Sequence, residues 1–142
     1  MSALDSTDAT TTGPRGPVVT GVDFVAVPTR SFAAALEFYG AVLGLHCSSR
    51  YRRAPGAELE TGNLTLQVLE SEAHGLEFQP SKHPIALHVE DVEAARAELE
   101  SRGVVFRGKT LDTGVCHMAF FEDPDGNALL LHRRYAPKEP GS

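Results

Sequence analysis

The chain has 142 residues, a formal net charge of −6 at pH 7 and two cysteines. This length fits one domain that buries well over half of its unfolded surface. The acidic charge argues against a nucleic-acid partner, because a phosphate backbone would repel the chain. Cys47 and Cys116 form no CxxC pair, which favours reduced thiols and a cytoplasmic location.

The start of the chain carries no targeting signal that we recognise. Residues 1–17 lack the basic and apolar regions of a signal peptide, and nowhere do apolar residues run on for the length that a membrane helix needs. We therefore expect a disordered tail over 1–17 and no membrane partner.

The first half of the chain predicts a strand, a helix and three further strands. A β-branched stretch that ends at Pro28 is typical of a strand. Ser31 offers an N-cap to a helix whose apolar residues recur at helical spacing, and Gly44 ends that helix. Extended pieces separated by turn signals follow over 45–53, 57–62 and 63–70, and then a polar loop.

The second half repeats this pattern. A strand over 83–89 precedes a helix capped by Asp91, and extended pieces follow over 104–108, 114–121 and 127–134. The distance from Ser31 to Asp91 is 60 residues and that from Asn63 to Asn127 is 64. We therefore predict an α+β fold: a single domain over 18–135 made of two βαβββ units, 18–70 and 83–135, followed by a C-terminal tail over 136–142.

Three segments carry a resemblance to a known family: "VDFVAVPTRSFAAALEFYGAVLGL", "IALHVEDVEAARAELESRGV" and "FFEDPDGNALLLH". Together they resemble the vicinal oxygen chelate superfamily, which holds glyoxalase I, fosfomycin and bleomycin resistance proteins, extradiol dioxygenases and methylmalonyl-CoA epimerase. The resemblance implies a curved mixed sheet whose concave side is a small-molecule cleft, and it implies a homodimer. Whether each cleft forms within one chain or between two stays open.

The resemblance also implies where a divalent metal would be held. Members that do chemistry use a His seven residues before each helix cap and a carboxylate four residues after the glycine of DPDG. In this chain those positions carry Phe24, Pro84 and Leu130, and the matching place in the first unit is Leu66, with Gln67 beside it. Since Phe, Pro and Leu have no lone pair to donate, we expect no metal cofactor at the usual site and an apolar cleft floor.

Three histidines keep a catalytic alternative open. His83 is next to Pro84, but side chains alternate along a strand, so His83 should face away from the cleft. His88 and His132 lie at even offsets from Pro84 and Leu130, which places both on the cleft face. They would be a displaced metal pair, a general acid and base, or rim residues bonded to water, and Glu60 is a possible third partner or a solvated side chain.

Arginines and aromatic residues complete the candidate site. Arg50, Arg52 and Arg53 surround Tyr51 and would clamp an anionic group or simply be solvated. Whichever of Phe120 and Phe121 faces inward would line the cleft. The candidate ligand-binding residues are Phe24, Arg52, Leu66, Gln67, Pro84, His88, Phe120, Leu130 and His132.

These features support three functions. The first is a metal-free protein that binds an apolar or aromatic small molecule. The second is a lyase, isomerase or dioxygenase-type enzyme that uses a displaced metal or the pair His88 and His132. The third is a structural subunit whose cleft is closed by its own side chains.

Overall fold

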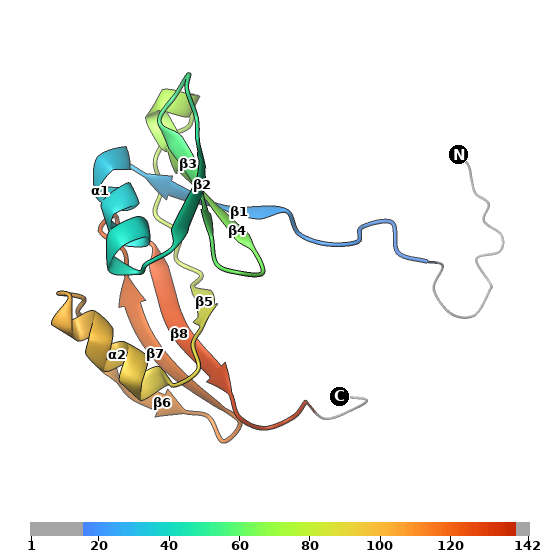
Figure 1. Ribbon diagram of the computed structural model, residues 1–142, viewed down its shortest axis with the longest axis vertical. Helices are drawn as coiled ribbons and strands as arrows, with labels where there is room; N and C mark the ends of the chain where they lie inside the picture. The colour runs from blue at the N-terminus through green and yellow to red at the C-terminus, as the bar shows by residue number, and fades with distance from the viewer. Residues whose placement is uncertain (1–15, 139–142) are drawn as a thin grey trace.

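The computed structural model describes residues 16–138 and consists of two βαβββ units in series (Figure 1). Most of the N-terminal tail expected over 1–17, and the last four residues of the C-terminal tail, lie outside the described residues. The two repeated units predicted from the sequence are confirmed, and the fold is α+β with two mixed sheets.

The first unit runs from β1 to β4. Its elements are β1 (Phe24–Thr29), α1 (Phe32–Leu36), the π-helical turn η1 (Glu37–Val42), β2 (His46–Arg50), β3 (Gly56–Glu60) and β4 (Thr65–Glu70). Its sheet has the order β1-β4-β3-β2, with β1 parallel to β4 and the other pairs antiparallel. Pro28 lies inside β1, which is an edge strand and so tolerates the missing N–H group.

The second unit follows a 3₁₀ turn, η2 (Ser71–His74), and an extended connection. Its elements are β5 (Ile85–His88), α2 (Val92–Ser101), β6 (Phe106–Asp112), β7 (Cys116–Glu122) and β8 (Ala128–Arg134). Its sheet has the order β5-β8-β7-β6, with β5 parallel to β8. Within the described residues, β1 and β5 each pair on one side only, so both expose a free strand edge.

Both helices begin where the sequence predicts. The side chains of Ser31 and Asp91 accept hydrogen bonds from the backbone N–H groups of Ala34 and Ala94. The first helix differs from the single α-helix that the sequence predicts, because it widens into a π-helical turn at Glu37. Core packing accounts for the π-helical turn, since Phe38 and Tyr39 are adjacent in sequence and both side chains are buried there.

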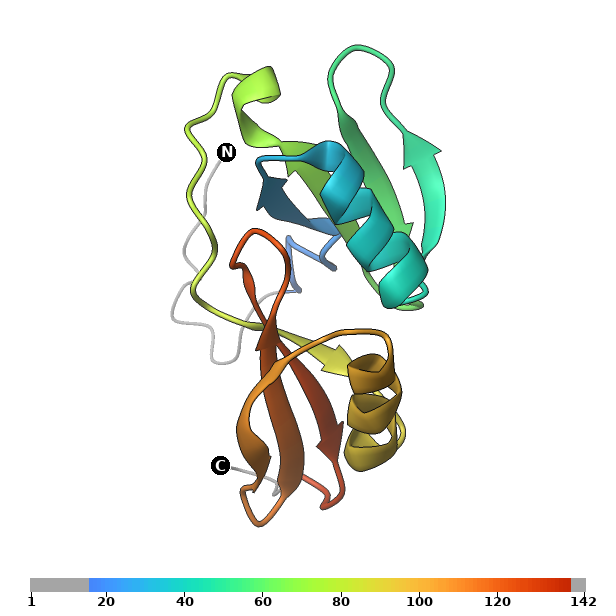
Figure 2. The same ribbon diagram turned by 90° about the vertical axis from the view of Figure 1, so that its left-hand side faces the viewer.

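The two helices lie on the same side of the molecule, each against its own sheet (Figures 1 and 2). The hydrophobic core lies between helix and sheet and is made of the alternate strand residues that face the helix. No helix among residues 16–138 is both long and apolar enough to cross a lipid bilayer.

The acidic turn between β7 and β8 joins the two units. The Tyr39 hydroxyl donates to Asp123 Oδ2 at 2.6 Å, and burial between the units, together with the nearby carboxylate, raises the pKa of Tyr39. The side-chain amide of Asn127 donates to the Pro28 carbonyl at 2.8 Å. Asp123 Oδ1 accepts the backbone N–H groups of Asp125 and Asn127, both at 2.9 Å.

A second contact lies beside this one. Asp125 accepts the buried Thr29 hydroxyl and the backbone N–H of Arg30. Gly126 closes the turn at φ +88°, a conformation that favours glycine. The DPDGN sequence thus supplies both the turn into β8 and the polar contact that fixes one unit against the other.

Removing the Tyr39 hydroxyl should weaken this contact. Tyr39→Phe leaves a buried carboxylate oxygen with one donor fewer, so we expect a loss of about 1–3 kcal/mol in unfolding free energy, measured by urea denaturation. Tyr135→Phe is the matched control, because its hydroxyl bonds to Asp112 at the surface, and it should cost less than about 0.5 kcal/mol. Equal losses in the two variants would contradict a special role for the turn.

Candidate ligand-binding faces

Each sheet has an open face, defined as the side opposite its helix. In the first unit the strand register places Phe24 beside Thr65 and Ala26 beside Gln67 on this face. Across the next pair, Gln67 is opposite Glu58 and Thr65 is opposite Glu60. The open face of the first unit is therefore mostly polar, with the half-exposed Phe24 at its edge (49% exposed).

A hydrogen-bonded triad lies on this face. The Tyr51 hydroxyl donates to Glu58 Oε2 at 2.6 Å and accepts from Gln67 Nε2 at 2.9 Å. Partial burial and the neighbouring Glu58 raise the pKa of Tyr51, so the hydroxyl keeps its proton at neutral pH. The triad holds three polar side chains in fixed positions, which suits directional recognition of a bound molecule.

Glu60 forms a second, smaller cluster. The Ser48 hydroxyl donates to Glu60 Oε2 at 2.5 Å and the Thr65 hydroxyl donates to Glu60 Oε1 at 2.7 Å. These two donors lower the pKa of Glu60. Glu60, considered from the sequence as a third partner for the histidines, is instead bonded within the first unit.

Leu66 is not on the open face, and the prediction that it floors the cleft is wrong. It is 0% exposed and pairs with Val25 on the helix-covered side. Gln67 takes the place that corresponds to Leu130, because Gln67 pairs with Ala26 and Leu130 with Ala86. The β3–β4 and β7–β8 turns differ in length, so counting from the glycine misses by one residue, and such a slip reverses the face.

The open face of the second unit is mostly apolar. Phe120 and Met118 on β7 pair with Leu130 and His132 on β8, and Leu130 pairs with Ala86 on β5. Phe121, adjacent to Phe120, is in the helix-side core at 1% exposure. The expectation of an apolar floor therefore fits this unit, whereas in the first unit it is wrong.

His88 and His132 occupy register-paired positions of the neighbouring strands β5 and β8. This places the two imidazoles on one face, as the even offsets predict. His88 is 61% exposed and its Nε2 lies 3.0 Å from Glu90 Oε2, and Glu90 also accepts from Arg133 Nη1 at 3.2 Å. Whether this pair acts in catalysis stays a prediction.

The remaining candidates lie at the periphery. Pro84 is exposed just before β5, and Arg52 is exposed in the β2–β3 connection. The Arg50 guanidinium stacks over the Phe32 ring at 5.4 Å, which places it on the helix side. Tyr51, the residue among these arginines, is the one that reaches the open face.

The residues at the usual metal positions do not fit a divalent cation. Phe24 and Leu130 have no donor atom, and the carboxylate beside His88, Glu90, is already bonded to His88 and Arg133. Across residues 16–138, no group of three or more His, Cys, Asp or Glu side chains is arranged to hold a metal ion.

The sequence analysis did not single out Glu58, Thr65, Ser48 or Met118. The signal was present for the first two, since "ELE" and "TLQ" alternate polar and apolar residues, the pattern of a strand with one covered face. The hydrogen bonds of Tyr51 and Ser48 could not be predicted from the sequence, because they depend on the irregular register between β2 and β3.

Two βαβββ units, each with an open sheet face, define the class of fold, and comparison with known proteins identifies the family. The model of the Glyoxalase/Bleomycin resistance protein/Dioxygenase superfamily matches residues 21–131. The chain belongs to this superfamily, and the resemblance noted from the sequence is confirmed. No curated protein sequence matches the chain.

Solved structures agree on the fold. TnmS3, an antibiotic-binding protein from Streptomyces sp. CB03234, is 22% identical with a TM-score of 0.71, over 83% of this chain and 98% of that one. A putative glyoxalase family protein from Bacillus anthracis is 20% identical with a TM-score of 0.72, over 84% and 99%. A glyoxalase/bleomycin resistance protein/dioxygenase from Nocardioides is 20% identical with a TM-score of 0.70, over 95% and 94%.

The two faces of β4 give a direct test of the register. Leu66→Ala should lower the unfolding free energy by about 2–5 kcal/mol, since it leaves a cavity in the core, whereas Gln67→Ala should change it by less than about 1 kcal/mol because Gln67 is on the open face. Denaturant titration of both variants measures this. A larger loss for Gln67→Ala than for Leu66→Ala would reverse the assignment of faces.

Proposed function

We propose that this protein binds a largely apolar or aromatic small molecule between the open face of the first unit and the open face of the second, without a divalent metal. One observation carries the proposal: both faces persist, while Phe24 and Leu130 occupy the places at which chemically active members of the family hold a metal.

The two faces supply different parts of the binding energy. Phe120 and Met118 offer apolar surface, worth about 25 cal/mol per Å² that a ligand covers, whereas Leu130 between them and β5 is only 6% exposed. The triad of Tyr51, Glu58 and Gln67 offers fixed polar groups for orientation. Pockets of this kind, mostly apolar with a few placed polar groups, are typical of small-molecule sites.

The likeness to TnmS3 supports the same class of function. That protein is described as antibiotic-binding, and it shares the fold of this chain. Sequestration of an antibiotic is therefore one form that the proposed binding takes.

The proposal includes a cytoplasmic homodimer. The free edge of β1 supports it, as do the exposed apolar residues just before this strand, Val18, Val19 and Val22. A second copy would cover these features and bring further open faces together. Light scattering on the protein as it elutes from a size-exclusion column should therefore give twice the mass of one chain. A monomer at all protein concentrations would contradict the proposed homodimer.

A ligand screen tests the binding function. Thermal denaturation with a panel of aromatic antibiotics, in buffer with EDTA, should identify a compound that raises the melting temperature, since a ligand of the native state stabilises it by mass action. Phe24→Ala and Phe120→Ala should each weaken its affinity about 5- to 30-fold, or roughly 1–2 kcal/mol. Val105→Ala, at an exposed position away from both faces, should leave the affinity unchanged. Stabilisation that requires an added divalent cation would overturn the metal-free proposal.

The register pairing of His88 with His132 favours one alternative, an enzyme of the lyase, isomerase or dioxygenase type. In a metal-free form, one imidazole would remove a proton and the other would deliver one. Any turnover found for a ligand from the screen should then fall at least 100-fold in His88→Gln and in His132→Gln, with ligand affinity nearly unchanged. Turnover that survives the double substitution would exclude this role.

A further inference from the structure

The two units meet along two related seams. In the first seam the β7–β8 turn lies against β1 and α1. In the second, the β3–β4 turn (61–64) and the C-terminal end of the first helix lie against β5 and α2. The repeat offset of 60 makes the elements of one seam the counterparts of the other.

The first seam is filled. The Tyr39 side chain and the DPDGN turn occupy it through hydrogen bonds to Asp123 and Asn127. The residues beneath are accordingly buried: Val27, Thr29 and Ala35 are at most 2% exposed.

The second seam is hollow. Leu99 stands at the counterpart of Tyr39, and the Thr61 hydroxyl bonds locally to the Leu64 carbonyl. The counterparts of the three buried residues, Leu87, Val89 and Ala95, are all partly exposed. Between the units lies a cavity of about 650 Å³, the seam cavity, lined mainly by Leu43, Leu45, Leu64, Ile85, Leu87 and Leu99.

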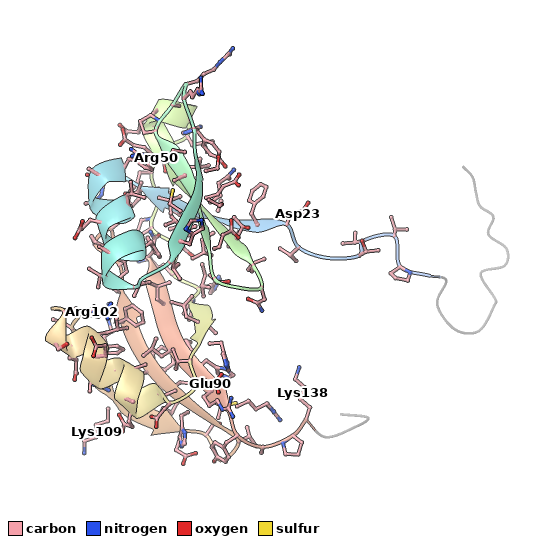
Figure 3. The ribbon with its side chains drawn as sticks, in the orientation of Figure 1. Asp23, Arg50, Glu90, Arg102, Lys109 and Lys138 are labelled. Atoms are coloured by element: carbon pink, nitrogen blue, oxygen red, sulfur yellow. The ribbon has the colours of Figure 1, made fainter. Side chains whose placement is uncertain are left out.

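Arg102 bounds one end of the seam cavity. Its Nη1 donates to the Val42 carbonyl at 2.8 Å and its Nε to Glu98 at 3.0 Å, so its charge is already bonded. Figure 3 shows Arg102 where the ends of the two helices approach each other. The other polar groups that border the cavity are side chains at its rim and the backbone N–H and C=O groups along the free edge of β5.

We propose that the seam cavity is a second binding site for a compact neutral apolar molecule, distinct from the open-face site and sharing with it only Ala86 and His88 of the edge strand β5. The volume falls within the 300–1,000 Å³ of small-molecule pockets. The seam cavity is partly open to solvent and lined mainly by apolar side chains, so an apolar guest that enters it gains by covering this surface. Arg102 is bonded to Glu98 and His88 to Glu90, so the mainly apolar lining offers no unpaired charge to a charged ligand. The occupant takes the place that Tyr39 fills in the other seam, so it stabilises the arrangement of the two units.

Fluorescence titration with N-phenyl-1-naphthylamine, a neutral apolar probe, tests the proposal. The protein carrying Phe120→Ser is used, so that binding to the open face is weakened and the remaining signal reports on the seam. Ala95→Leu and Ala95→Phe, which fill the cavity from α2, should reduce probe affinity at least tenfold and raise the melting temperature by about 2–5 °C. Ala94→Phe is the matched control, because it adds the same ring at an exposed position one residue earlier, and probe affinity should not change.

Unchanged affinity in both Ala95 variants, or no probe binding to the parent protein, would overturn the proposal. Xenon pressurisation of wild-type crystals keeps the test valid if those variants fail to fold, since xenon should occupy the cavity, and its absence there would count against the site. If association of two chains displaces the probe, a second copy covers the seam and the proposal is wrong. The open-face function is unaffected in each case, because its own variants lie on the other side of the sheets.

Discussion

The contact between the DPDGN turn and the first unit determines how the two halves of this protein are arranged. Asp123 and Asp125 are buried carboxylates: Asp123 accepts from Tyr39 of the first unit and from Asn127 of the turn, and Asp125 accepts from Thr29 and Arg30 of the first unit. Carboxylates in such surroundings are tolerated only when their hydrogen bonds are complete. The relative placement of the two sheets, and with it the shape of every surface between them, therefore follows from one five-residue turn.

The sequence predicted the architecture well because the fold depends on local signals. Ser31 and Asp91 identified both helix starts, and the repeat offset identified two equivalent units. The first helix ends before Gly44 as predicted, and the feature that the sequence missed is the π-helical turn inside it, where the adjacent Phe38 and Tyr39 are both buried. No local sequence pattern predicts the π-helical turn, since packing between the two units determines it.

The candidate site was less predictable. Positions on β5 and β8 were assigned to the correct face, because one register relates His88 to His132 and Ala86 to Leu130. Leu66 was assigned wrongly, since the turn before β4 shifts the register by one residue relative to the second unit. The polar network around Tyr51 depends on side-chain contacts between strands, which the order of residues alone does not determine.

The chemical difference between the two open faces affects how a ligand would be oriented between them. A cleft built from two identical halves would accept an amphipathic guest in two equivalent poses related by the pseudo-twofold axis. Here one half presents carboxylates, an amide and a phenol, and the other presents Phe120 and Met118. Because the two halves differ chemically, the ligand proposed above would have a single preferred direction.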